Sequence, residues 1–338
     1  MLLNKITLLK LGTVIVMLLN GTLGCTTRLY QDISSSISPQ PLAVPNGEFE
    51  SVTWFDENHI AFVYRPDELM PNDMNEDFRI GIFEISTNTV KDLTSLHSTL
   101  DCYRKQGRIS NLSRLPNGSL GFIFHCASSG DGLYLLNLES NEIVKQQTYL
   151  GFTAQSFSFS PDMSQIIQEN GNGGGLSEEL LLVSSDGTMN ELLPDFQRAR
   201  SPAWTSDGKT IAFAGTQNNP NYSEITTLQD IESLFLYPWD IYLMNADGSN
   251  PRILLPLVGT IYGLKWSPTN ENLLLFGGNS FDNVPGVWLL DVVNASVKRI
   301  WNKNSNFDWS PDGSKIVLLD NATDVWWRSI TIIDIANQ

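Results

Sequence analysis

Few residues of this chain have the types and spacing that catalysis requires. Histidine is the usual side chain for proton transfer near neutral pH, and the chain holds only His59, His97 and His125. No serine stands in a Gly-x-Ser-x-Gly elbow, and the zinc-binding spacings His-x-x-x-His and Cys-x-x-Cys do not occur. The sequence therefore predicts a protein that is not an enzyme and that uses neither a metal nor another cofactor.

The charge balance excludes one large class of partner. The 338 residues include 37 acidic and 21 basic side chains, for a net charge of -16. Phosphate binding needs clustered lysine and arginine, so the balance argues against nucleic acid. The apolar content of 41% is normal for a globular protein with a sizeable core.

The first residues have the pattern of an export signal. Lys5 and Lys10 precede a short apolar stretch, Leu11 to Leu19, which is too short to span a membrane. The stretch ends in Thr22-Leu23-Gly24-Cys25, which resembles the bacterial lipobox, although that pattern usually has Leu where Thr22 stands. We expect a signal peptide over 1–24, lipid on Cys25 and a place in the bacterial cell envelope, with the lipid as the only membrane attachment. An ordinary signal peptide cut nearby and an uncleaved anchor remain alternatives.

A phrase of the type Trp-Ser-Pro-Asp-Gly recurs six times, with two copies of weaker ending, at Phe159 and Trp266, and two degenerate copies, at Trp54 and Arg114. Each copy precedes an apolar run, and a second apolar strand with a polar turn follows at a period of roughly 40 to 60 residues, the range of a four-stranded propeller blade. Proline presets the first corner of such a turn, and glycine takes its left-handed position. The copies begin at Trp54, Arg114, Phe159, Trp204, Trp266 and Trp309.

The strands after these turns are apolar on both faces, as in Ile316-Val317-Leu318-Leu319. In a sheet with one solvent-exposed face, apolar and polar residues would alternate along each strand. Both faces of these strands must therefore be covered, as in blades packed around an axis. The sequence predicts an all-β fold: a six-bladed β-propeller of four-stranded antiparallel blades over 37–338. The sixth blade has three strands of its own, so we expect Ile37 to Val44 to supply its outer strand and close the ring. Residues 25–36 are then expected to be a lipid-anchored tether.

The phrases resemble the TolB-type propeller repeat over about residues 50 to 338. Trp309-Ser310-Pro311-Asp312-Gly313 matches one half of that repeat, and Met244 to Arg252 matches the other almost letter for letter. The resemblance implies a fold and not a function. TolB carries an additional α/β domain ahead of its propeller, for which this chain has no room, so a role in the same envelope complex is not expected.

The two faces of the predicted disc differ. If strands A to D run outward from the channel, the A–B and C–D turns lie on one face, here called the tight-turn face. The B–C and D–A connections lie on the other, called the loop-bearing face. The long segments fall on the loop-bearing face, which we therefore expect to bind a partner. They are Arg65 to Phe78, Ser95 to Gly107, Gly215 to Trp239 and Gly277 to Pro285.

Particular side chains on the loop-bearing face are candidates for binding. Aromatic residues bury much area at little entropic cost, although they could instead pack the loops onto the disc, which we favour for Trp239. Basic residues could hold an anion or could pair with the surplus acids, and we favour pairing. The candidates are Tyr222, Phe235, Tyr237, Trp239, Trp326, Trp327, Arg104 and Arg108. Arg198 and Arg200 could likewise hold an anion or pair with acidic residues.

Cysteine placement also fits export. Cys102 and Cys126 remain as a pair if Cys25 is acylated, and both fall on the loop-bearing face, so we expect a disulfide between them. Two free buried thiols are the alternative. The acidic run Asp67 to Asp77 matches no EF-hand spacing and is expected to be a solvated loop.

These observations favour a monomeric, non-catalytic envelope lipoprotein that binds a protein or a glycan. The alternative is a small-molecule sensor or a lactonase-like metal-dependent hydrolase that uses the channel. For that alternative, the candidate residues near the inner strands are Asn111, Asn306 and Asp308.

Overall fold

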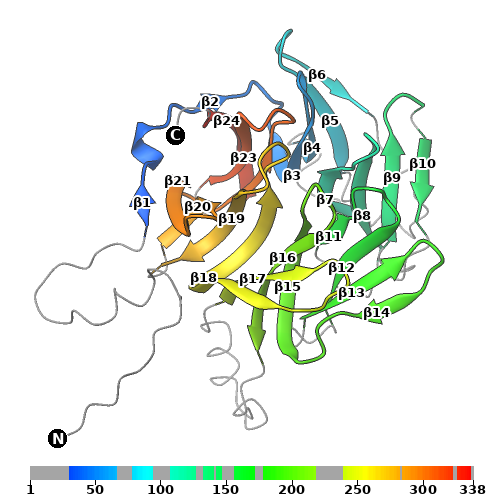
Figure 1. Ribbon diagram of the computed structural model, residues 1–338. Coiled ribbons are helices and arrows are strands. Elements are labelled where there is room, and N and C mark those ends of the chain that lie inside the picture. The colour runs from blue at the N-terminus through cyan, green and yellow to red at the C-terminus, as the bar shows by residue number, and fades with distance from the viewer. Residues whose placement is uncertain are drawn as a thin grey trace, which may run out of the picture.

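The strands pair antiparallel in sequence order and form six four-stranded blades arranged in a ring (Figure 1). The computed structural model describes residues 30–66, 78–93, 107–126, 132–140, 142–146, 156–171, 178–217, 239–281, 284–322 and 326–335. The fold class expected from the sequence, a six-bladed β-propeller, is confirmed.

Blades one to three are built from consecutive strands. In each, the first strand lies nearest the channel and the fourth at the rim. Blade one contains β3 (Gly47–Asp56), β4 (His59–Pro66), β5 (Arg79–Glu84) and β6 (Thr89–Asp92). Blade two contains β7 (Gly107–Arg114), β8 (Leu120–Cys126), β9 (Gly132–Asn137) and β10 (Glu142–Lys145). Blade three contains β11 (Phe157–Phe159), β12 (Gln165–Gly171), β13 (Glu178–Ser184) and β14 (Met189–Glu191).

Blades four and five share one continuous strand. The first part of β18 pairs with β17, and from Gly259 onward the same strand pairs with β19. It is therefore the outer strand of blade four and the inner strand of blade five. The strands are β15 (Phe196–Trp204), β16 (Thr210–Gln217), β17 (Trp239–Asn245), β18 (Arg252–Trp266), β19 (Leu273–Ser280), β20 (Val284–Asp291) and β21 (Ser296–Trp301).

Blade six is completed by the N-terminal segment, as predicted. Its own strands are β22 (Ser305–Trp309), β23 (Lys315–Ala322) and β24 (Trp326–Asp334). The fourth strand is β2 (Gln40–Pro41), which pairs antiparallel with Thr331 and Ile332 of β24. The Leu42 amide continues the pairing by donating to the Ile330 carbonyl at 2.8 Å. The edge that β24 would otherwise expose is thus covered.

The expected tether is partly a strand of the disc. Within 25–36 the structure describes residues 30–36, and these lie against blade five. There β1 (Gln31–Asp32) pairs parallel with Lys298 and Arg299 of β21, followed by a 3-10 turn at Ser34–Ser36. An ion pair of 3.0 Å between Asp32 and Arg299 joins the same elements. The apolar run and the lipidation residue Cys25 lie outside the described residues.

The hydrophobic core consists of clusters between neighbouring blades. Phe122 of blade two packs with Ile80 of blade one in one cluster, and each later pair of blades has a cluster of its own. The last cluster joins Trp54 of blade one to Val317 and Leu319 of blade six, so packing as well as pairing closes the ring. This arrangement explains why the strands are apolar on both faces.

The tight-turn face is built from turns that satisfy their own polar groups. In the turn of blade six, the Asp312 carboxylate accepts bonds from the Ser310 hydroxyl at 2.6 Å and the Ser314 amide at 3.0 Å, and Gly313 has a φ of 71°. These hydrogen bonds lower the pKa of Asp312 to about 2. Asp162 and Asp207 occupy the same place in blades three and four, and their pKa values are also lowered to about 2 by equivalent bonds.

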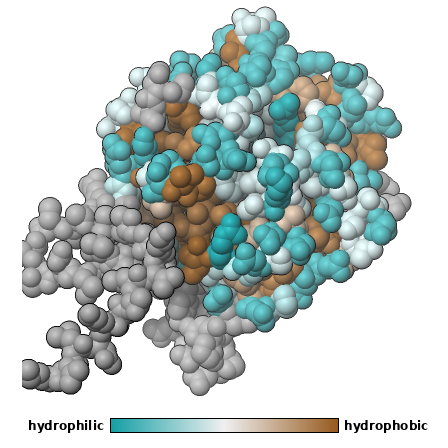
Figure 2. Space-filling model, viewed as in Figure 1, coloured by the Kyte–Doolittle hydropathy of each residue, from teal (hydrophilic) through white to brown (hydrophobic). Residues whose placement is uncertain are grey.

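The visible surface mixes polar and apolar side chains. Figure 2 shows hydrophobic side chains gathered on the part of the visible surface where β18, β19 and β20 lie in Figure 1. Within the described ranges, no helix has the length and apolarity to cross a membrane.

Candidate functional site

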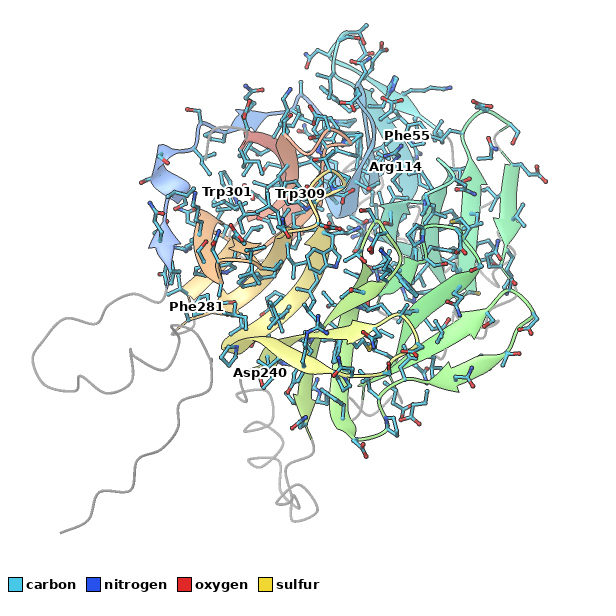
Figure 3. All side chains as sticks on the ribbon, in the orientation of Figure 1. Phe55, Arg114, Asp240, Phe281, Trp301 and Trp309 are labelled. Atoms are coloured by element: carbon cyan, nitrogen blue, oxygen red, sulfur yellow. The ribbon has the colours of Figure 1, made fainter. Side chains whose placement is uncertain are left out.

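The inner strands enclose a channel that contains a cavity. It has a volume of about 670 Å³ and is lined by residues of β7, β11, β15, β18 and β22, with Val52 from β3. A second cavity of about 390 Å³ opens among the Trp-Ser-Pro turns of the tight-turn face. Arg114 and Asp308 line both cavities, so they mark the neck between them. Figure 3 places Arg114 and Trp309 nearer the middle of the ring than Asp240 and Phe281.

Bulges interrupt the inner strands beside the cavity. The register of β7 against β8 shifts between Ser110 and Ser113, and that of β15 against β16 shifts between Arg200 and Ala203. At these shifts Asn111 and Ser201 take left-handed φ values of 52° and 53°. Such conformations are unfavourable for residues with a side chain and persist where the surrounding structure holds them. Both residues line the channel cavity.

A lysine crosses the neck of the channel. Lys265 of blade five has its Nζ 3.2 Å from Ser113 Oγ, in blade two on the opposite side of the ring. The same Nζ lies 3.6 Å from Asp308 Oδ1 of blade six. The Oδ2 of Asp308 accepts bonds from the Thr53 hydroxyl and from the Trp54 amide of blade one. Four blades therefore meet through Lys265 and Asp308, and one Asp308 oxygen is committed to holding blade one.

A buried carboxylate holds the inner strands together on the cavity wall. Glu169 of β12 is 2% exposed, and its Oε2 accepts bonds from the Ser156 hydroxyl at 2.6 Å and the Ser201 amide at 3.2 Å. Asn304 also lines the cavity; its Nδ2 donates to Asn279 Oδ1, and its buried Oδ1 has no hydrogen-bond partner.

The channel residues named from the sequence do line the cavity. Asn111, Asn306 and Asp308 are all part of its wall. Asp308 is already bonded to Thr53, Trp54 and Lys265, so a cation would have to displace Lys265 to reach its Oδ1. Among the residues that the structure describes, no three His, Cys, Asp or Glu side chains are grouped so as to hold a metal ion.

Trp239 is a core residue and not an exposed binding residue. Its side chain is 2% exposed and belongs to the cluster between blades four and five. The guanidinium groups of Arg198 and Arg200 lie over its ring, with their Cζ atoms 4.8 Å and 4.1 Å from the ring centroid. Its place in the list of binding candidates was therefore wrong, and the packing alternative favoured for it is confirmed. Trp239 anchors the root of the 218–238 connection.

Of the other candidates, the structure describes one side chain. Arg108 is half exposed and forms an ion pair of 2.6 Å with Glu50 of blade one, as the pairing alternative predicts. Cys126 is buried at the end of β8 and is disulfide-bonded, while the predicted partner Cys102 lies outside the described residues. The remaining candidates, or their side chains, also lie outside them: Arg104, Tyr222, Phe235, Tyr237, Trp326 and Trp327.

The sequence did not identify the two cationic residues at the neck, Lys265 and Arg114. Lys265 stands directly before Trp266 of a repeat phrase, and Arg114 begins another. A lysine or arginine at the end of an inner strand, next to the repeated aromatic position, is the signal that could have identified them.

Structures of known proteins resemble this fold. TolB from Acinetobacter baumannii matches with a TM-score of 0.60 at 14% identity, over 83% of this chain and 64% of that protein. The fold is that of a TolB-like β-propeller. A gluconolactonase from Xanthomonas campestris matches with a TM-score of 0.56 at 9% identity, over 89% of this chain and 90% of that one. At these identities the likeness establishes the fold alone.

Comparison of sequences adds one partial relative. Tricorn protease homolog 1 from Streptomyces coelicolor is 30% identical over 123 residues, which are 33% of this chain and 12% of that protein. No protein-family model matches the chain. The chain therefore has a TolB-like propeller fold, and the solved structures that resemble it include both TolB and a gluconolactonase.

Proposed function

We propose that the chain is a lipid-anchored binding protein of the bacterial cell envelope. Its propeller recognises a protein or glycan partner through the loop-bearing face and performs no catalysis. The observation that carries the proposal is the difference between the two faces. The tight-turn face ends in short turns whose polar groups bond to one another, as at Asp312, whereas strands β4 and β16 lead into the longer connections 67–78 and 218–238 on the opposite face.

The rigid frame under those connections supports the same proposal. The longest connection, 218–238, runs between Gln217 of β16 and Trp239 of β17, where Trp239 is fixed by two arginines and by the core. Recognition loops are commonly held in this way by a scaffold that does not itself change. A disulfide between Cys102 and Cys126 would hold a second connection on the same face.

The N-terminal segment that contains β1 and β2, here called the N-terminal clasp, sets the expected position of the disc on the membrane. The chain joins blade five at Tyr30 to Asp32, and an extended chain from Cys25 to Tyr30 reaches at most about 18 Å. A lipid on Cys25 would therefore hold the rim of blade five close to the bilayer. Both faces of the disc would then stay open to partners in the envelope.

The proposal is tested by capture from the host's own envelope. The protein from residue 26 onward is used as bait on solubilised envelope, with cross-linking before identification. A matched bait has 218–238 replaced by a short Gly-Ser linker, which keeps Gln217 and the core residue Trp239 in place. A second control, Lys209→Ala, alters an exposed side chain on the tight-turn face.

We expect one protein or glycan that is captured by the parent and by the Lys209→Ala control and is lost with the linker variant. Equal capture by all three baits would place recognition elsewhere on the disc. An absence of any specific capture by the folded, oxidised parent would contradict the proposal.

A further inference from the structure

We propose that the neck of the channel is a binding site for a small hydroxylated carboxylate, such as a sugar acid. This inference is separate from the proposed partner on the loop-bearing face. It rests on two cationic side chains and a polar-lined cavity of suitable size.

The neck holds more positive than negative charge. Among the described residues, the cavity that includes the neck is lined by three basic side chains, Arg114, Arg200 and Lys265, and by two acidic ones, Glu169 and Asp308. Asp308 is only partly available, because its Oδ2 is bonded to Thr53 and Trp54 while Lys265 Nζ stands 3.6 Å from its Oδ1. Within the described part of the chain, the Arg114 guanidinium has no hydrogen bond or ion pair, and its side chain is exposed.

This local charge is unusual for the chain as a whole. In a protein of net charge -16, an exposed arginine would be expected to find a carboxylate. Arg114 instead lines the same cavity as Lys265, and the proposed anion receives bonds from both groups. The excess is one positive charge, which matches a monocarboxylate better than a phosphate dianion.

The rest of the cavity suits hydroxyl groups. Asn306 lines the cavity, and its side-chain amide offers both donors and an acceptor to ligand hydroxyls. Tyr262 also lines the cavity and is 56% exposed as a residue, so its ring can offer an apolar surface for the carbon face of a sugar ring. The volume of about 670 Å³ falls within the usual range for small-molecule sites.

The pre-formed walls favour binding without rearrangement. Asn111 and Ser201 are held in left-handed conformations beside the cavity, and the Ser201 amide is tied to buried Glu169. The ligand would meet fixed groups and would lose little affinity to ordering the protein. We therefore expect binding to be measurable in the folded protein without any partner.

The test is titration of the full mature protein with sodium glucuronate, followed by calorimetry and by the shift in the unfolding midpoint. Glucose and inorganic phosphate serve as comparison ligands. The informative variants are Arg114→Gln and Lys265→Met, and the matched control is Lys91→Met, which removes an exposed lysine from β6 at the rim. A fourth protein is the 218–238 linker variant.

Glucuronate is expected to bind the parent, Lys91→Met and the linker variant with equal affinity. Its affinity should fall about tenfold or more in Arg114→Gln and in Lys265→Met, because each loses a charge-assisted hydrogen bond. Glucose should bind at least tenfold more weakly than glucuronate, and phosphate should compete poorly.

Three results would overturn the proposal. One is a lack of glucuronate binding to the folded parent, and another is unchanged affinity in Arg114→Gln, which is exposed and should fold normally. The third is phosphate binding as tight as that of glucuronate, which would rule out the carboxylate class. Because the linker variant keeps the neck intact, failure here and failure of the loop-bearing face are distinguished.

Discussion

The indole N–H of Trp309 in blade six donates a hydrogen bond of 3.1 Å to the backbone carbonyl of Lys265 in blade five. Trp266 makes the corresponding bond of 3.0 Å to Ala203 in blade four. In each case the repeated tryptophan reaches back to the residue before the repeat phrase of the preceding blade. The repeat therefore does more than form a turn, because it ties neighbouring inner strands together at the channel.

We predict that Trp309→Phe and Trp266→Phe each lower the free energy of unfolding by about 1 to 2 kcal/mol, because each leaves a carbonyl without its donor. Urea denaturation measures the effect. Tyr262→Phe removes the hydroxyl group of an exposed side chain nearby and should change stability by less than about 0.5 kcal/mol. Equal effects in all three variants would argue against a role for the indole bonds.

Removal of the N-terminal clasp should act in two steps. A chain beginning at residue 37 lacks β1 and the Asp32–Arg299 ion pair, and should lose about 1 kcal/mol. A chain beginning at residue 45 also lacks β2 and buried Ile37, and should lose a further 2 to 4 kcal/mol or so. It should also associate through the uncovered edge of β24, which size-exclusion chromatography detects. If the shorter chain is as stable and monomeric as the parent, β2 does not close the ring in solution.

Acid should destabilise the protein through the repeated aspartates. The pKa values of Asp162, Asp207 and Asp312 are lowered to about 2, below the value of about 3.9 expected when unfolded. The unfolded chain therefore binds more protons in this range, so the stability that these groups provide is present above about pH 4. It is lost as the pH falls toward about 2. The triple variant with Asn at the three positions should show a shallower fall of the thermal midpoint between pH 5 and 2.5. Parallel curves for parent and variant would contradict this assignment.

Two glycines in the interface between blades five and six should respond differently to alanine. A Cβ on Gly277 would lie 2.5 Å from Phe307 Cε1, whereas a Cβ on Gly263 would lie 3.6 Å from Phe307 Cζ. Gly277→Ala should therefore lower stability by about 1 to 3 kcal/mol through overpacking, and Gly263→Ala should be nearly neutral. Chemical denaturation of both variants compares them directly. A neutral Gly277→Ala would show that Phe307 moves aside at no cost.

Much of the architecture could be predicted because each blade repeats a local signal. The turn residues around Asp162, Asp207 and Asp312 specify the same turn wherever they occur. Local patterns do not show where a strand passes from one blade to the next, so the continuous β18 was not foreseen. Nor was the parallel pairing of β1, which depends on Arg299 far along the chain.

The site was less predictable than the fold, because it depends on residues from distant blades. Lys265 and Ser113 meet across the channel although they are distant in sequence, and neither stands in a catalytic motif. Trp239 was predicted to be a binding residue because it is aromatic. It is buried because it stands at the start of β17 against two arginines.

Site-specific photo-cross-linking tests the proposed recognition face most directly. A photoreactive residue is placed at Asn302, in the connection from blade five to blade six on the loop-bearing face, or at Lys209 in a turn of the tight-turn face; both side chains are exposed. Each protein is irradiated in solubilised host envelope. The account predicts that one specific partner is cross-linked from Asn302 and is not cross-linked from Lys209. A partner cross-linked from Lys209 alone would contradict it.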